Sequence, residues 1–172
     1  ELIGAKPAFL RSIRGRRIGI IFQEPMTSLN PLHSIERQIG EVLRVHQHMD
    51  EKAAKARVLE LLDLVGLPHM KERLSAYPHE LSGGQRQRVM IAIALANNPD
   101  MQIADEPTNA LDVTVQAQIL ELLADLKDRL GMALLLITHD LTVVKKMADK
   151  VCVMKDGEIV EQQSAADLFA KP

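Results

Sequence analysis

The chain has 172 residues but only one cysteine, no tryptophan, three phenylalanines and one tyrosine. A single cysteine cannot form an internal disulfide, which excludes a small disulfide-stapled domain. We expect Cys152 to be a small buried apolar side chain, because residues 151–154 are otherwise apolar. No apolar run approaches the ~18 residues that a membrane-spanning helix requires, and the first residues lack the pattern of a signal peptide.

Neither positive nor negative charge is in large excess, with 21 Lys and Arg against 23 Asp and Glu. The formal net charge of −2 argues against nucleic acid as a partner, because phosphate-binding surfaces usually leave a basic excess. Arg14, Arg16 and Arg17 form the one tight basic cluster, which fits a solvated turn better than a binding patch.

One glycine pattern is missing as well. Nowhere does Gly-x-x-x-x-Gly-Lys-Ser/Thr occur, and no glycine is followed directly by lysine. The loop and lysine that cradle nucleotide phosphates in many enzymes are therefore not in this sequence. The sequence also lacks an initiator methionine, so we expect it to be a piece of a longer chain.

The hydrophobic periodicity that is present predicts an α/β protein. Apolar runs bounded by turn residues predict strands at 18–22, 101–104 and 132–138. The last of these is continuously apolar in its middle, which predicts that both its faces are covered. Asp156-Gly157 favours a two-residue hairpin turn. Helical spacing and caps predict helices at 34–47, 51–65, 82–97, 112–130, 141–149 and from 164.

The run Ser82-Gly83-Gly84-Gln85 opens the third of these helices. Serine followed by glutamine three residues later is a capping box, and capping alone explains those two residues. Capping does not explain two glycines, each of which costs about 1 kcal/mol relative to alanine in a helix. Glycines let a ligand approach the free N–H groups at a helix N-terminus, which favours phosphate binding.

Polar residues follow three of the predicted strands. Gln23 follows the first, Asp105 and Glu106 follow the second, and His139 follows the third. Each of these residues alone could lie in an ordinary solvated loop. We expect Asp140, which follows His139, to cap the next helix. Because ligands bind at the carboxyl ends of parallel strands, the set predicts a metal and phosphoryl-transfer site at one rim.

These residues together resemble the nucleotide-binding domain of ABC transporters. Residues 81–85 match the signature motif, residues 101–106 the Walker B motif and catalytic glutamate, and Gln23 the Q-loop. Residues 110–112 match the D-loop and His139 the switch histidine. Residues 22–31 and 112–120 resemble the ATPases of dipeptide, oligopeptide and nickel importers, in particular the first half of the tandem-ATPase peptide importers of the Yej type.

The resemblance implies a P-loop NTPase core of RecA type, with a mostly parallel sheet and an inserted helical subdomain. That subdomain would span residues 24–98, residues 1–23 and 99–172 would belong to the core, and an N-terminal part would lie outside the sequence. It also implies a peripheral protein on the cytoplasmic face of the inner membrane, which hydrolyses ATP to power import of peptides or related solutes. The partners would be permease subunits, a second ATP-binding domain and, indirectly, a solute-binding protein, but no nucleic acid.

The implied cofactors are ATP and Mg²⁺. By resemblance, Asp105 would bind Mg²⁺ through water, Gln23 would touch the same metal shell, and Glu106 would polarise the attacking water. His139 would contact the γ-phosphate. Residues 82–85, that is Ser82, Gly83, Gly84 and Gln85, would close over ATP held by the opposing domain, and Asp112 would brace the dimer interface.

The sequence departs from the family at several points. Gln102 stands where the family prefers an apolar residue, so we expect the strand to be less well covered there. Asn109 replaces a common threonine or serine. The Walker A motif and an adenine-stacking aromatic are missing, so we expect the isolated polypeptide to be inactive.

A second hypothesis is a non-transport ABC ATPase acting in DNA repair or on ribosomes. Such proteins usually carry zinc-binding cysteines, inserted coiled coils or basic arms, and this sequence shows none of them. The transported solute is open on the sequence alone, with nickel as one alternative to peptides.

Overall fold

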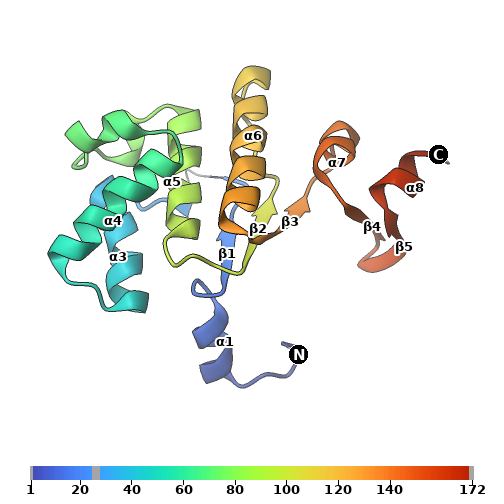
Figure 1. Cartoon of the computed structure of the whole chain (residues 1–172), viewed down its shortest axis with the longest axis horizontal. Helices are drawn as coiled ribbons and strands as arrows, with labels where there is room; N and C mark the ends of the chain where they lie inside the picture. Colours follow the sequence, from blue (N-terminus) through green and yellow to red (C-terminus); the bar gives the residue numbers. More distant parts are fainter. Residues whose placement is uncertain (1, 25–27, 171–172) are drawn as a thin grey trace. The chain divides into compact units, whose positions relative to one another are not determined.

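The computed structural model describes residues 2–24 and 28–170, and its chain divides into two compact units, Glu1–Leu135 and Leu136–Pro172. The strands β1 (Ile18–Ile21) and β2 (Met101–Asp105) pair in parallel, with Ile18 beside Met101 and Ile21 beside Ala104. The strand β3 (Ala133–Ile137) completes the order β1-β2-β3 (Figure 1). The predicted α/β fold with a parallel sheet is therefore confirmed.

Three helices of the first unit pack against one another. They are α3 (Ile35–Gln47), α4 (Glu51–Leu64) and α5 (Gly83–Leu95), and their buried side chains include Ile39, Leu61 and Ile91. The helices begin at the residues the sequence indicates, because the side chains of Ser34, Asp50 and Ser82 accept hydrogen bonds from backbone N–H groups of the first turns.

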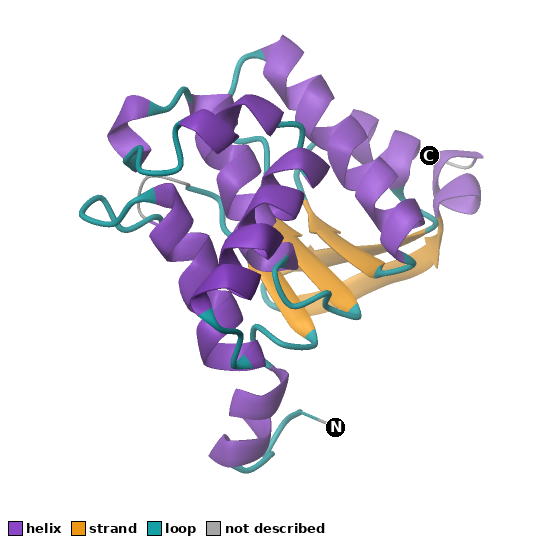
Figure 2. Cartoon of the chain, turned by 60° about the vertical axis from the view of Figure 1, so that its left-hand side comes forward, coloured by secondary structure: helices purple, strands orange, loops and turns teal. Residues whose placement is uncertain are grey.

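Shorter helices join and precede these elements. Two 3₁₀ helices, η1 (Pro68–Glu72) and η2 (Pro78–Glu80), connect α4 to α5. The helix α1 (Pro7–Ile13) precedes β1 and was not predicted, although Pro7 at its first position is a recognised start signal. The arrangement of helices around the strands can be followed in Figure 2.

The strands of the sheet alternate in burial. In β1 and β2, Ile21, Gln102 and Ala104 are buried, and α5 packs against β1. On the opposite face of β1, Ile20 is 41% exposed. In β3, Leu135 is 46% exposed. The prediction that β3 is covered on both faces is wrong, because its five residues alternate between exposed and half-buried and none of them is buried.

Gln102 also differs from expectation, since it is fully buried. Its register partner on β1 is Gly19, and a Cβ atom at that glycine would lie 2.6 Å from the Gln102 Oε1 atom. The absence of a side chain at Gly19 therefore makes room for the amide, which is why a polar residue fits in a covered position. The Gln102 Nε2 atom donates a 3.2 Å hydrogen bond to the Ile103 carbonyl.

The long helix α6 (Val113–Leu130) follows β2 in the first unit. It begins after Asp112 and ends at Gly131, whose φ of 61° is the left-handed conformation typical of a helix C-terminus. Its buried side chains are Ile119, Leu123 and Leu126. The predicted helix is confirmed at both ends.

The second unit contains α7 (Leu141–Met147), β4 (Lys150–Lys155), β5 (Glu158–Ser164) and α8 (Ala165–Ala170). The strands β4 and β5 form an antiparallel hairpin. Asp156 and Gly157 have φ values of 51° and 84°, the two positive values that a type I′ turn requires, as predicted.

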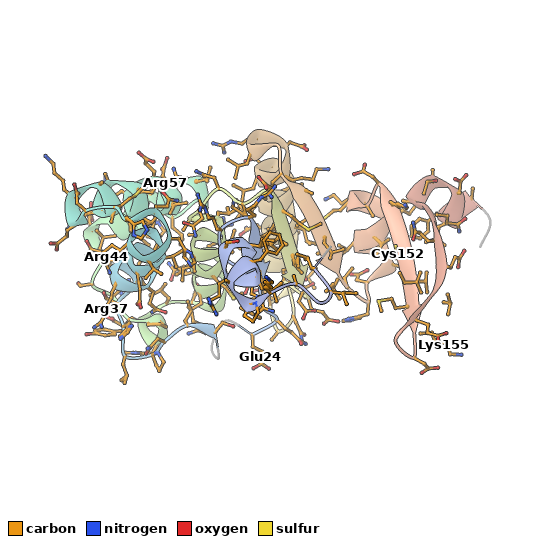
Figure 3. All side chains as sticks on the ribbon, turned by 90° about the horizontal axis from the view of Figure 1, so that it is seen from below. Glu24, Arg37, Arg44, Arg57, Cys152 and Lys155 are labelled. Carbon is orange, nitrogen blue, oxygen red and sulfur yellow. The ribbon has the colours of Figure 1, made fainter. Side chains whose placement is uncertain are left out.

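Cys152 lies on β4 and is exposed, so its predicted burial is wrong (Figure 3). The apolar run around it reflects strand preference rather than burial, because most positions of this hairpin are exposed. Throughout residues 2–24 and 28–170, no helix is both long and apolar enough to cross a lipid bilayer.

Candidate functional site

The carboxyl ends of β1 and β2 bring three of the predicted site residues to one edge of the sheet. Since Ile21 pairs with Ala104 and the strands are parallel, the segments that follow them leave the sheet at the same edge. Gln23 lies two residues beyond Ile21, and Asp105 and Glu106 directly follow Ala104. Gln23 is exposed and the two carboxylates are half-buried, so this edge offers three side-chain oxygen groups to a ligand from solvent.

The turn after β2 has an unusual backbone. Glu106 has a φ of 42° and Ala110 a φ of 60°, which are left-handed conformations that residues with side chains rarely adopt. The Asn109 N–H donates to the Glu106 carbonyl at 3.1 Å, and the Leu111 N–H donates to the Thr108 carbonyl at 3.3 Å. Strained residues of this kind cost about 1–3 kcal/mol each and concentrate at functional sites.

Two glutamine side chains hold this turn from neighbouring helices. The Gln87 Nε2 atom of α5 donates to the Pro107 carbonyl at 2.6 Å, and Gln87 is only 1% exposed. The Gln116 Nε2 atom of α6 donates to the Thr108 carbonyl at 3.1 Å. Consecutive carbonyls after Glu106 are thus bound by side chains from two different helices.

The capping box at the start of α5 is present. The Ser82 Oγ atom accepts from the Gln85 N–H at 3.3 Å, and the Gln85 Oε1 atom accepts from the Ser82 N–H at 3.0 Å. The Gln85 Nε2 atom also lies 3.3 Å from the Nε2 atom of His69 in η1. Ser82 is exposed, and the N-terminus of α5 therefore faces solvent.

The two glycines of this run have a packing role that the sequence did not reveal. A Cβ atom at Gly84 would lie 2.9 Å from the Cγ1 atom of Val115, closer than real Cβ atoms come to such a neighbour. At Gly83 the nearest atom would be the Cδ2 atom of Leu111, at 3.4 Å. Close approach of α5 to the start of α6 therefore explains Gly84 without any ligand, whereas Gly83 has room for a methyl group.

The remaining predicted site residues are placed as follows. Asp112 is the N-cap of α6, because its Oδ1 atom accepts from the Val115 N–H at 3.0 Å. His139 is exposed and lies in the second unit, between β3 and α7, so the structure does not join it to the cluster in the first unit.

Asp140, beside His139, caps α7 as the sequence predicted. Its Oδ1 atom accepts from the Thr142 N–H at 2.8 Å. The hydrogen bond from the Thr142 backbone holds the pKa of the Asp140 carboxyl below its ordinary value, and the Val143 N–H and the neighbouring His139 act in the same direction.

The donor set at the sheet edge fits Mg²⁺ bound together with a nucleotide. Among the residues that the structure describes, no group of three or more His, Cys, Asp or Glu side chains could hold a metal ion by itself. Mg²⁺ is usually bound by one or two carboxylates together with waters and substrate phosphates. Asp105 offers one carboxylate and Gln23 an amide oxygen, which leaves the other positions to waters and phosphates.

Comparison with known proteins identifies the family. The profile of the ABC transporter family matches residues 6–109. The chain belongs to the ABC transporter family.

Similar ABC proteins cover the chain almost completely. It is 64% identical over 163 residues to the peptidoglycan transport ATP-binding protein YejF of Agrobacterium fabrum, covering 95% of this chain and 30% of that protein. It is 51% identical over 172 residues to the oligopeptide transport ATP-binding protein OppD of Bacillus subtilis, covering 100% of this chain and 48% of that protein. These relatives confirm the predicted resemblance to ATP-binding proteins of peptide importers. The chain spans less than half of the length of either relative.

Solved ABC structures share the fold. The dimeric ATP-binding cassette MJ0796, bound to ADP and Pi, has a TM-score of 0.79 and 33% identity, covering 94% of this chain and 68% of that one. The protein cbiO1 from Clostridium perfringens has a TM-score of 0.80 and 32% identity, covering 95% of this chain and 62% of that one. The α/β core is therefore that of a P-loop NTPase of the ABC family.

Sequence reasoning missed Gln87 and Gln116. A signal for Gln87 was available, since it shares a helix face with Met90 and Ile91, three and four residues later, and both are buried. A polar residue on an apolar face needs a partner, but the sequence cannot say that the partner is the Pro107 carbonyl.

Proposed function

We propose that this chain is part of an ATP-hydrolysing ABC subunit that powers the import of peptides or related small solutes through a membrane permease. One observation carries the proposal: in this member of the ABC family, Gln23, Asp105 and Glu106 follow two paired parallel strands at the same edge of the sheet. The names of the relatives, which refer to transport of peptidoglycan and of oligopeptides, support the solute class.

In this proposal each polar group at the sheet edge has one role. Asp105 would hold Mg²⁺, and Gln23 would contribute an oxygen to the same site. Mg²⁺, when bound, neutralises charge on the transferred phosphate. Glu106, which is half-buried and directly follows β2, would accept a proton from the attacking water. His139 lies in the second unit, and we assign it to the γ-phosphate only by resemblance to the family.

The site is completed by a second ATP-binding domain. Residues 82–85, at the N-terminus of α5, close over the phosphates of ATP held by that domain, because a helix N-terminus with small residues favours a bound anion. Asp112 lies at the interface between the two domains. Two similar solved structures, both of the cassette MJ0796, are dimers, which supports a pair of ATP-binding domains.

In this proposal the permease binds the helical subdomain, which spans residues 24–98. A wide, open depression of about 420 Å³ lies beside α3 and offers a surface for a partner helix. Val45, at its rim, is 60% exposed. The depression is lined by Ser28, Asn30, His33, Gln38, Glu41, Val42, Val45, His46 and Ile93. The subunit then lies on the cytoplasmic face of the inner membrane as a peripheral protein, and a solute-binding protein acts only through the permease.

The substitution Glu106→Gln in the intact protein tests this function. It keeps the size and hydrogen-bonding capacity of the side chain but removes the base, so we expect ATP to bind with unchanged affinity while hydrolysis falls by about a hundredfold or more. Nucleotide affinity and phosphate release are measured on the same preparation. Glu121→Gln, at an exposed position of α6, is the matched control and should hydrolyse ATP normally.

Two results would contradict the proposal. Near-normal turnover of the Glu106→Gln protein would remove the catalytic role given to that carboxylate. Purification of the intact protein with nucleic acid, instead of with a permease, would favour an ABC ATPase outside transport.

A further inference from the structure

The turn that carries Glu106 is held by two side-chain amides that no step of the proposed reaction uses. Gln87 is 1% exposed and its Nε2 atom lies 2.6 Å from the Pro107 carbonyl oxygen. The half-buried Gln116 reaches the next carbonyl, that of Thr108, at 3.1 Å. Burying a glutamine is costly unless its amide is hydrogen-bonded. The presence of these amides, where apolar side chains could have packed, therefore needs an explanation.

The conformation of Glu106 supplies that explanation. Its φ of 42° is a left-handed value that the residue would leave if the following segment were free to relax. A conformation of this kind persists only where the surrounding structure imposes it. The two carbonyls that are bound belong to the first and second residues after Glu106, which are the positions that decide where the backbone goes after the left-handed residue.

We propose that Gln87 and Gln116 are positioning residues for Glu106. They bind the Pro107 and Thr108 carbonyls from α5 and α6 and so keep the Glu106 carboxylate in its orientation at the sheet edge. This inference rests on the proposed function, because it assigns the two amides to the hydrolytic step. Neither amide touches nucleotide or metal in this assignment.

The position of Gln87 adds a consequence. It lies on α5, five residues after Ser82, so the helix whose N-terminus is proposed to act on ATP of the opposing domain also holds the catalytic turn of its own domain. One hydrogen bond, from Gln87 to the Pro107 carbonyl, therefore links α5 to the turn of Glu106.

The test replaces each amide by methionine in the intact protein with its permease. Methionine keeps the length and volume of glutamine but cannot donate a hydrogen bond. For Gln87→Met and Gln116→Met we expect kcat for ATP hydrolysis to fall about ten- to a hundredfold, because small displacements of a catalytic group cost that much. The KM and the affinity for ATP should stay unchanged, because binding does not use Glu106.

Two controls separate positioning from general stability. Gln47→Met removes a comparable amide that donates to the Ala96 carbonyl, away from the sheet edge, and should lower the melting temperature without changing kcat. Gln118→Met changes an exposed glutamine of α6, the helix of Gln116, and should change neither quantity. In a Glu106→Gln background, Gln116→Met should cause no further loss, since the group that it positions is already absent.

Each outcome decides the matter. Unchanged kcat in both variants, while the wild-type protein hydrolyses ATP, overturns the positioning role and leaves the proposed function intact. A further loss of kcat in the Glu106→Gln background also overturns it. The role is overturned as well if Gln47→Met loses as much kcat as these variants at an equal drop in melting temperature. Should Gln87→Met fail to fold, Gln116→Met decides. An intact wild-type protein without ATPase activity overturns the proposed function and this inference together.

Discussion

Adding a methyl group at Gly84 tests whether close packing of α5 against α6 requires that glycine. In the structure an alanine Cβ at this position would lie 2.9 Å from the Val115 Cγ1 atom. Val115 is β-branched and sits in a helix, where its side chain has essentially one rotamer and cannot turn away. The helices must therefore move apart.

The expected magnitude follows from two opposing terms. Overpacking of a closely packed contact costs roughly 1–3 kcal/mol. Replacing glycine by alanine in a helix returns up to about 1 kcal/mol. We expect Gly84→Ala to destabilise the domain by about 1 kcal/mol net, which lowers the melting temperature by roughly 2–4 °C for a domain of this size.

A double-mutant cycle and the neighbouring glycine make the test specific. Val115→Ala shortens the opposing side chain, so the Gly84→Ala change should cost less, or become stabilising, in that background. Gly83→Ala is the matched control, since its Cβ atom would meet only the Leu111 Cδ2 atom at 3.4 Å, and it should not lower the melting temperature. Thermal melts of the four cycle members and the control give the answer.

The same variants separate packing from ligand binding. If Gly83 serves the approach of a phosphate to the backbone, Gly83→Ala lowers ATP hydrolysis of the intact protein while its melting temperature stays unchanged. The packing argument fails if Gly84→Ala melts at or above the wild-type temperature, or if Val115→Ala gives no relief.

Two further predictions concern the cap of α7 and the isolated polypeptide. Because the pKa of Asp140 is lowered in the folded state, its contribution to the helix is complete above the ordinary aspartate pKa and is lost as the pH falls through the lowered value. An NMR titration of the Asp140 carboxyl checks this, and a midpoint at or above the ordinary value would contradict it, while Asp140→Asn should cap α7 without pH dependence. The 172-residue polypeptide alone should release no phosphate from ATP, since its sequence contains no Gly-x-x-x-x-Gly-Lys-Ser/Thr loop; measurable turnover by this polypeptide would refute the expectation.

Local signals predicted the elements well because each element carries its own start and stop residues. Ser82 caps the helix that it was expected to open, and Asp156-Gly157 forms the expected turn. Ser34 and Asp50 cap the two helices that were predicted over 34–47 and 51–65. These interactions join residues two to four positions apart, so they can be read from a linear sequence.

Burial was harder to predict because it depends on what packs against an element. Cys152 and Gln102 show this in opposite directions. Cys152 lies in an apolar run but is exposed, whereas Gln102 is polar but fully buried, because Gly19 on the neighbouring strand leaves space for its amide.

The sequence by itself determined the order of the elements, the polar residues at the strand ends and the resemblance to ABC ATP-binding domains, since all of these rest on residue types at fixed spacing. Only the tertiary structure decided that Gly84 makes room for Val115, and that Gln87 and Gln116 hold the turn after Glu106. Gln87 lies twenty residues from its partner and Gly84 thirty-one from Val115. Contacts over such separations arise from the packing of α5 and α6 in three dimensions, which no local pattern specifies.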